Sequence, residues 1–294
     1  MAAPGMAHAI DELAMSAETQ ALLSRLNEAR LTPGTHDSLT LAEEMELRAV
    51  ERQWLESECA AIQSRAATAP GDADQFMGWF EALRENGPGQ NDKLFRWLAE
   101  EASLDDMAWF LAQEVAGEAG FDDLVALTQL KLPVRAKLEM ARNYWDEMGR
   151  GRESGMHGPM LDRLAADLDI AERNFPVTWE AVAIGNLMMG LAANRAHTFR
   201  SVGALGVIEL TAPSRAIRVT EGLERLNVAA KSRRYYALHA TLDLKHSAEW
   251  NEEVIRPLVR ENPETARHIA EGALMRLNAG ARCFERYRRE LGVK

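Results

Sequence analysis

Helix-forming residues dominate this chain of 294 residues, and segments with the alternating pattern of a β-strand are scarce. Leu, Ala, Glu, Arg and Met have high helix propensity and recur throughout the sequence. No repeat with a period of roughly 20–50 residues is present, which excludes a solenoid. The sequence therefore predicts an all-α protein with about seven core helices and under about 5% strand.

Proline and glycine mark the expected helix boundaries, because proline is tolerated near helix ends and glycine in the turns between them. The loop Asn86-Gly87-Pro88-Gly89 is the predicted junction between an N-terminal helical extension, residues 1–88, and a helical domain, residues 89–294. We expect helices over residues 9–30, 39–68, 72–85, 90–101, 104–130, 133–149, 156–172, 177–200, 203–210, 213–228, 233–259 and 263–291.

Charge and composition exclude several classes of protein. The net charge of −11, from 34 basic and 45 acidic residues, argues against nucleic acid as a partner, which requires a basic face. No stretch approaches the roughly 18 apolar residues of a membrane span. Asp11 and Glu12 interrupt an N-terminus without a basic region, so no signal peptide is expected and the predicted location is cytoplasmic. Two cysteines, Cys59 and Cys283, are too few for a disulfide framework or a cysteine-ligated iron–sulfur site.

The segment Tyr235–His246 places His239, Asp243 and His246 on one narrow stripe of a helix, because each residue turns about 100°. Their span of roughly 10 Å is long for a single ion, so the stripe suits two. Asp243 and His246 would bind one ion, and His239 would bind the other. The alternative is an exposed polar face on which His239 is a hydrogen-bonded core residue.

A second candidate pair is Glu147 and His157, ten residues apart in the sequence. The helix that carries Glu147 is expected to end at Gly149 or Gly151, because glycine accepts the left-handed conformation, and His157 then begins the next helix. The two side chains can converge across this turn. Alternatively, they are a charged helix end and a loop histidine.

Further carboxylates lie in apolar surroundings. Glu209 follows a glycine-containing apolar run, where a carboxylate is costly unless it is paired or bound to metal. Glu114 and Glu118 are neighbours on one helix face, and one of them is expected to point inward. The alternative for Glu209 is a position at a helix end that faces water.

Taken in order, these residues resemble the pattern of the haem-oxygenase-like di-iron oxidases and oxygenases. That pattern has a Glu, then a carboxylate and a His ten residues apart, then a Glu, then His-x3-Asp-x2-His about thirty residues later. The resemblance covers about residues 90–290, with Glu118 as an alternative first ligand. It implies a seven-residue ligand set: Glu114, Glu147, His157, Glu209, His239, Asp243 and His246.

The resemblance implies a haem-oxygenase-like bundle that binds two Fe ions, with O2 as co-substrate and an external electron donor, either a reductase or a chemical reductant. Carboxylate and imidazole ligands suit Fe(II), and four carboxylates largely neutralise two ferrous ions. Within the resemblance, Glu147 assists the Asp243/His246 ion and Glu209 bridges. The expected reaction is N-oxygenation or oxidative C–C cleavage of a small, amine- or amino-acid-derived metabolite, through a peroxo-diferric intermediate. Whether residues 1–88 form a homodimer interface is left undecided, and no membrane partner is expected.

Other readings remain. A cofactor-free or thiaminase-type enzyme of the same fold would need a nucleophile such as a cysteine, and Cys59 and Cys283 lie far from the clustered elements in the sequence. A true haem oxygenase needs a proximal histidine on an early helix, for which His8 and His36 are poorly placed. The third alternative is a non-enzymatic helical binding protein. Iron content separates these readings.

Overall fold

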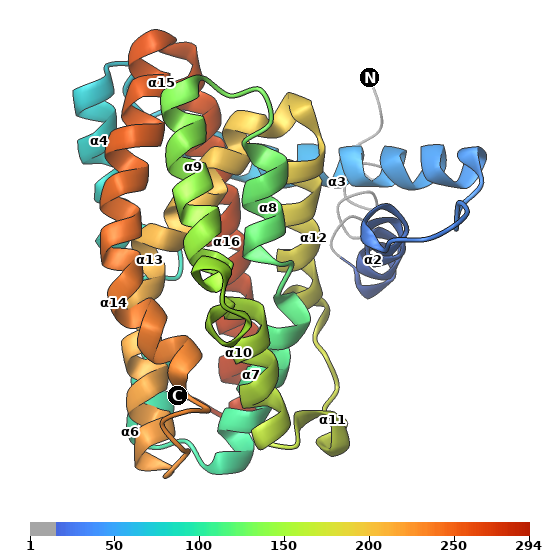
Figure 1. Cartoon of the computed structure of the whole chain (residues 1–294), viewed down its shortest axis with the longest axis vertical. Coiled ribbons are helices and arrows are strands. Elements are labelled where there is room, and N and C mark those ends of the chain that lie inside the picture. The colour runs from blue at the N-terminus through green and yellow to red at the C-terminus, as the bar shows by residue number, and fades with distance from the viewer. Residues whose placement is uncertain (1–15) are drawn as a thin grey trace.

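The computed structural model describes residues 16–294, and this part of the chain is helical with no β-strand (Figure 1). A single isolated bridge pairs Met148 with Met156. The prediction of an all-α protein is therefore confirmed. None of the described helices is long and apolar enough to cross a membrane. The elements are α2 (Ala17–Leu31), α3 (Leu41–Ala66), α4 (Ala73–Glu81), α5 (Leu83–Asn86), α6 (Lys93–Glu100), α7 (Leu104–Gly117), α8 (Phe121–Thr128), α9 (Val134–Glu147), the 3-10 turns η1 (Gly149–Gly151) and η2 (Glu153–Gly155), α10 (His157–Asp167), α11 (Ile170–Arg173), α12 (Trp179–Ala193), η3 (Arg195–His197), α13 (Thr198–Arg225), α14 (Arg234–Glu249), the π-helical segment η4 (Trp250–Ile255), α15 (Arg256–Glu261) and α16 (Glu264–Leu291).

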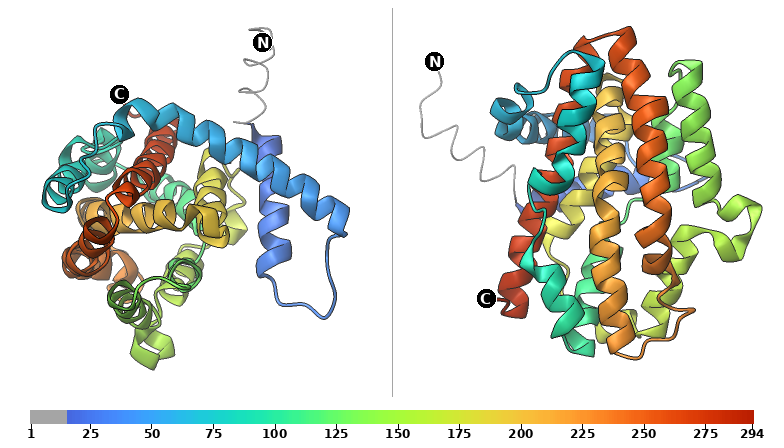
Figure 2. Two further views of the ribbon diagram at one scale, coloured as in Figure 1. Left: turned by 90° about the horizontal axis from the view of Figure 1, so that it is seen from above. Right: turned by 90° about the vertical axis from the view of Figure 1, so that its left-hand side faces the viewer.

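Two 28-residue helices, α13 and α16, form the centre of the bundle, and α14, α12 and α6 pack around them (Figures 1 and 2). The backbones of α13 and α16 come very close at Gly203. A Cβ atom at this position would lie 1.9 Å from the carbonyl oxygen of Ile269, so only glycine permits this packing. The close approach fixes α13, which also carries part of the candidate site.

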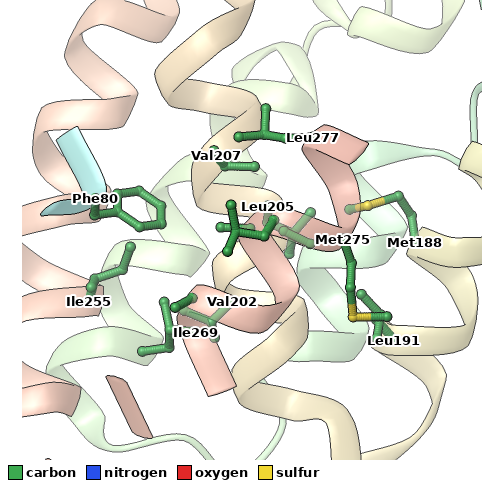
Figure 3. Close-up of a cluster of buried hydrophobic side chains, with 14 of the residues drawn as sticks. Phe80, Met188, Leu191, Val202, Leu205, Val207, Ile255, Ile269, Met275 and Leu277 are labelled. Carbon is green, nitrogen blue, oxygen red and sulfur yellow. The ribbon is translucent and has the colours of Figure 1, made fainter. Parts of the chain in front are cut away.

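The apolar core lies between these helices (Figure 3). Val202 and Leu205 of α13 meet Ile269 and Met275 of α16, and all four side chains are at most 1% exposed. Burying such a side chain contributes about 1.5–3 kcal/mol to stability. Phe80, which precedes the predicted junction at residue 88, belongs to the same core, and the division into an extension and a domain stays a prediction.

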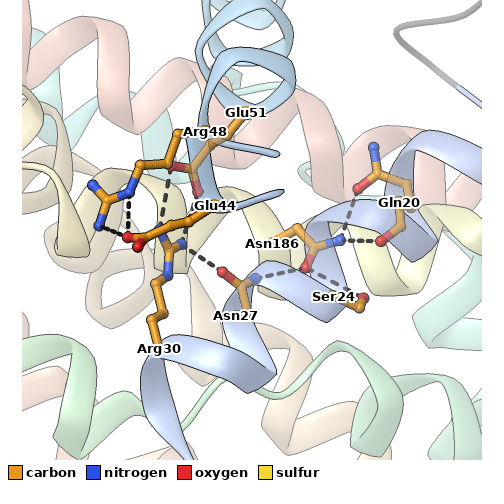
Figure 4. A network of polar contacts seen from close by, with 8 residues as sticks. All are labelled: Gln20, Ser24, Asn27, Arg30, Glu44, Arg48, Glu51 and Asn186. Carbon is orange, nitrogen blue, oxygen red and sulfur yellow. Dashed lines mark hydrogen bonds and ion pairs between the residues drawn. The ribbon is translucent and has the colours of Figure 1, made fainter. Parts of the chain in front are cut away.

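Helix α2 and the first part of α3 extend from the side of the bundle, whereas the rest of α3 packs on α16. A polar network attaches α2 to α12 (Figures 2 and 4). Asn186 of α12 donates to the backbone and side-chain oxygens of Gln20, both at 3.0 Å, and accepts from Asn27 at 2.7 Å. Arg30 and Glu51 form an ion pair of 2.7 Å that joins α2 to α3. The beginning of the first predicted helix, residues 9–15, lies outside the described residues.

Several predicted helix boundaries are wrong. The helix expected over 104–130 is divided into α7 and α8, because the backbone is extended at Glu118 and left-handed at Gly120, where φ is 72°. The helix expected over 177–200 ends at Ala193.

The two helices expected over 203–210 and 213–228 are one continuous helix, α13, with Pro213 inside it. Proline removes one backbone hydrogen bond from a helix interior, and the packing of α13 on α14 and α16 outweighs that loss.

Candidate metal centre

Four helices bring the predicted ligands together. Glu147 is the last residue of α9 and His157 is the first of α10, while Glu209 lies midway along α13. His239, Asp243 and His246 lie on α14, as the sequence predicts. The ligand atoms converge in two groups, each within 4.8 Å: Glu147, His157 and His239, and Glu147, Glu209 and His246. Glu147 is common to both groups, a position that the resemblance assigned to Glu209.

The turn between α9 and α10 positions Glu147 against His157. Gly149 has a φ of 60°, and a Cβ atom there would lie 2.3 Å from the backbone of Gly155. Glycine is therefore required for the chain to reverse so tightly. The reversal places His157 Nδ1 2.6 Å from a carboxylate oxygen of Glu147.

In the first group, a hydrogen bond and a ring contact fix the orientation of His239. Its Nδ1 lies 2.7 Å from the backbone oxygen of Tyr235, and its ring packs edge-on against His157 with 4.7 Å between centroids. A histidine that donates one ring N–H to a backbone carbonyl leaves the other nitrogen free to bind a metal ion. His239 therefore has the geometry of an oriented metal ligand.

In the second group, two residues to which sequence reasoning assigns no role support the ligands. Asp146 lies 3.2 Å from His246 Nε2, and Asn143 donates a 2.6 Å hydrogen bond to Glu209. His246 Nδ1 faces the Glu209 carboxylate at 3.5 Å. Asn143 lies one helical turn before Glu147 on α9, and this spacing is the sequence signal that could have found it.

Two of the predicted ligands lie outside both groups. Asp243 is 2% exposed and lines the same cavity as the groups. Glu114 also lines this cavity, but its charge interacts with Arg215 and Arg276. Glu118 lines the cavity as well, and its charge is among those that raise the pKa of Glu147.

Burial and mutual repulsion disfavour charge in this site. Burial, then the charges of Glu209 and Glu147, raises the pKa of Asp243 to about 10, and burial likewise raises the pKa of Glu147. Burial lowers the pKa values of His157 and His239 to about 4.

His246 behaves differently from the other two histidines. Burial alone would lower its pKa, but the neighbouring carboxylates of Glu209 and Asp146 outweigh burial and raise it to about 9. In the protein without metal, this histidine therefore acts as a cation among carboxylates.

The buried polar atoms of this site fit metal ions. Asp243 Oδ1 is buried without a hydrogen-bond partner among the described residues, and His157 Nδ1 and His246 Nδ1 are buried facing carboxylate oxygens without a well-aligned hydrogen bond. Leaving such atoms unsatisfied costs about 1–3 kcal/mol each, and coordination to a cation would satisfy them. Imidazole nitrogens and carboxylate oxygens at this spacing are a donor set suited to Fe, Mn or Zn.

The groups open onto an internal cavity of about 190 Å³. Much of its wall is apolar and comes from α7, α10, α12 and α13, including Phe110, Leu161, Ile184, Met188 and Ile208. A cavity of this kind, with a few convergent polar groups, is typical of a small-molecule site.

Comparison with known proteins agrees with the fold and with this chemistry. The chain has a haem-oxygenase-like helical fold, shared with solved structures described below. Residues 108–281 match the family described as iron-containing redox enzymes, and the chain belongs to that family. The matched range contains all seven predicted ligands.

Two solved structures illustrate the shared fold. A CADD-like protein of unknown function from Nostoc punctiforme is 17% identical, with a TM-score of 0.56, and the match covers 74% of this chain and 95% of that chain. A domain of unknown function with a heme oxygenase-like fold from Shewanella denitrificans is 14% identical, with a TM-score of 0.52, covering 75% of this chain and 92% of that one. No curated protein matches the chain.

Proposed function

We propose that this chain is an O2-activating, non-haem di-iron oxidase or oxygenase. Its proposed substrate is a small, amine- or amino-acid-derived metabolite, and an external donor supplies electrons. The observation that carries the proposal is the sharing of Glu147 by two groups of converging ligand atoms. One carboxylate common to two such groups suits a pair of ions better than a single ion.

The proposed ligands divide between two ions. His157 and His239 would bind one ion, Glu209 and His246 the other, and Glu147 would bridge them. Asp243, which lines the same cavity, would be a further ligand. Both Glu114 and Glu118 remain candidates for the first ligand, and the electrostatic proximity of Glu118 to Glu147 favours Glu118.

The iron would supply the electrons that reduce O2. The protein's own residues would orient the ligands, hold the substrate and exclude water. Tyr235 and Asp146 fix the rings of His239 and His246, so little reorganisation is needed when ions bind. The apolar side chains of Phe110, Ile184 and Met188 line the cavity, where exclusion of water would prevent side reactions.

Anaerobic reconstitution with Fe(II) tests the proposal. We expect about two irons per chain after removal of excess metal, and iron-dependent O2 consumption when reductant is added. A matched control is Arg218→Gln, which changes an exposed residue of α13 paired with Glu221 and should leave both readouts unchanged. Binding of one iron or none, or O2 uptake independent of iron, would contradict the proposal.

The alternative of a cofactor-free or thiaminase-type enzyme with a cysteine nucleophile has little support at the cavity. Burial raises the pKa of Cys283 to about 12, and its sulfur donates to the backbone oxygen of Glu180. A thiol that is protonated at neutral pH is a weak nucleophile. Burial also raises the pKa of Cys59, and neither cysteine lines the described cavity.

A further inference from the structure

Two arginines line the cavity without a counter-ion in direct contact. Arg215 projects from α13 and Arg276 from α16. Within residues 16–294, no carboxylate oxygen lies within 4.0 Å of either guanidinium, and neither side chain makes a hydrogen bond. Nε of Arg276 is buried and unpaired. Unpaired guanidinium groups inside a protein are unusual, because burying a charge without a partner is costly.

Other largely buried arginines of this chain do have partners. Arg30 binds Glu51 at 2.7 Å, Arg200 binds Glu271 at 2.8 Å, and Arg282 binds Glu58 at 2.8 Å. The fold therefore neutralises its interior arginines as a rule. Arg215 and Arg276 depart from this pattern, and both face the cavity next to the candidate metal centre.

Aromatic packing holds one of these guanidinium groups in place. Arg215 lies over the rings of Phe95 and Phe284, at 5.9 and 5.7 Å from their centroids. Cation–π contact uses the face of the guanidinium and leaves the N–H edge available for a planar acceptor. A carboxylate is such an acceptor, and arginine binds it with two parallel hydrogen bonds.

Glu114 is the carboxylate whose charge affects both arginines most. Burial raises the pKa of Glu114, and the charges of Arg215 and Arg276 oppose that rise, so the three groups interact through space. Their separation exceeds ion-pair distance, however. Burial and the like charge of Arg276 also lower the pKa of Arg215 to about 10, which leaves it cationic at neutral pH. An anion bound between the two arginines would offset the cost of burying them and the repulsion between their charges.

The position of Arg215 relative to the ligands suggests how a substrate would lie. Arg215 follows Glu209 by six residues on α13, which is a rise of roughly 9 Å. Its charge also interacts with Asp243 of α14. A small molecule held by one end at Arg215 would therefore extend along the apolar wall toward the ligand groups.

We infer that Arg215 and Arg276 form the carboxylate-binding subsite of the cavity, and that the substrate is a small carboxylic acid held there by its carboxylate. The assignment of this ligand as substrate rests on the proposed function. The binding step does not, because the arginines are independent of any metal.

Binding of simple carboxylates to the metal-free protein tests the subsite, since iron then cannot contribute. Butanoate, hexanoate and octanoate are the probes, hexanamide is the uncharged comparison, and calorimetry or ligand-observed NMR gives the dissociation constants. We expect the best carboxylate to bind about tenfold or more tightly than hexanamide, which is the usual effect of a charge-assisted hydrogen bond. Arg215→Met and Arg276→Met keep much of the side-chain volume and should each weaken carboxylate binding about tenfold.

Arg218→Met is the matched control, because Arg218 is exposed on the same helix and pairs with Glu221. It should bind hexanoate as the wild type does. Melting temperatures establish that each variant is folded, and if Arg276→Met does not fold, Arg215→Met decides. Equal binding of hexanoate and hexanamide, no binding of any carboxylate at millimolar concentration, or unchanged affinity in Arg215→Met would overturn the inference. Iron content, measured on the same preparations, tests the proposed function separately.

Discussion

Replacement of Asp243 by Asn should stabilise the metal-free protein and abolish part of its metal binding. Asp243 is 2% exposed, and one of its carboxylate oxygens is buried without a hydrogen-bond partner among the described residues. Burial and the charges of Glu209 and Glu147 raise its pKa from 3.8 to about 10. The folded protein without metal must therefore keep this acid protonated at neutral pH.

The size and sign of the effect follow from this pKa. A group whose pKa is raised by folding contributes stability that is complete below its unfolded pKa and is lost as pH rises toward its folded pKa. Keeping Asp243 protonated at pH 7 costs about 1.36 kcal/mol for each of the roughly three pH units above 3.8, or about 4 kcal/mol in all. Asparagine is neutral at every pH, so the variant should gain up to about that amount at pH 7. The gain should shrink toward zero near pH 4.

Urea unfolding of metal-free wild type and Asp243→Asn between pH 4 and pH 8 measures this difference. Asp146→Asn is the control with the opposite sign. Burial alone would raise the pKa of Asp146, but Arg150 and His246 outweigh burial and lower it, so its ionised form stabilises the fold. The Asp146 variant should therefore be less stable than the wild type at pH 7, with a smaller difference at acid pH.

Addition of Fe(II) under anaerobic conditions should then reverse the order. The wild type gains stability from metal that binds only the folded state, and Asp243→Asn gains less because one anionic ligand is missing. If Asp243→Asn is less stable than the wild type at every pH, Asp243 has a structural hydrogen bond and the reasoning is wrong. The same holds if both proteins gain equally from Fe(II).

Three further predictions concern the ligands and the turn. His246→Ala should deplete one iron and leave the other partly occupied, and His239→Ala should do the reverse. Metal analysis with Mössbauer spectroscopy distinguishes the two irons. Equal loss of both irons in each variant would contradict two separate ions. Gly149→Val should lower iron content several-fold without unfolding the bundle, because a Cβ at this turn collides with backbone and moves α10, and a variant with full iron content would show that the turn does not position ligands. Glu118→Gln should reduce iron content more than Glu114→Gln if Glu118 is the first ligand, and the opposite order would restore Glu114 to that position.

Local sequence patterns predicted most of the helices, and three of the predicted ligands lie together on one helix as expected. The spacing of His239, Asp243 and His246 follows from the helical repeat alone, so it could be read from the sequence. The turn after Glu147 could also be anticipated, because Gly149 marks a position where the backbone takes a positive φ. Where local patterns failed, packing decides the outcome, as at Pro213, which lies inside a continuous helix rather than at a helix end.

The two arginines could not have been found in the same way. Arg215 and Arg276 are 61 positions apart in the chain, and nothing in their local sequence distinguishes them from the exposed arginines around them. Only the packing of α13 against α16 places them on one cavity and leaves them without carboxylate partners. The resemblance also gave Glu114 as the first ligand, from its position ahead of the Phe121 segment, and kept Glu118 as the alternative.

The position of Glu114 connects carboxylate binding at the two arginines with metal binding at the ligand groups. If Glu114 neutralises the arginines in the empty protein, it is held away from the metal groups, and Glu118 is left to complete them. A carboxylate bound between Arg215 and Arg276 would then take over part of that neutralisation and free Glu114 to move. Ligand binding and metal binding would thus be coupled through one side chain, and by linkage each should strengthen the other. Titration of Fe(II) with and without hexanoate measures this coupling. Glu114→Gln should remove it, and coupling that survives in the variant would show that Glu114 does not carry it.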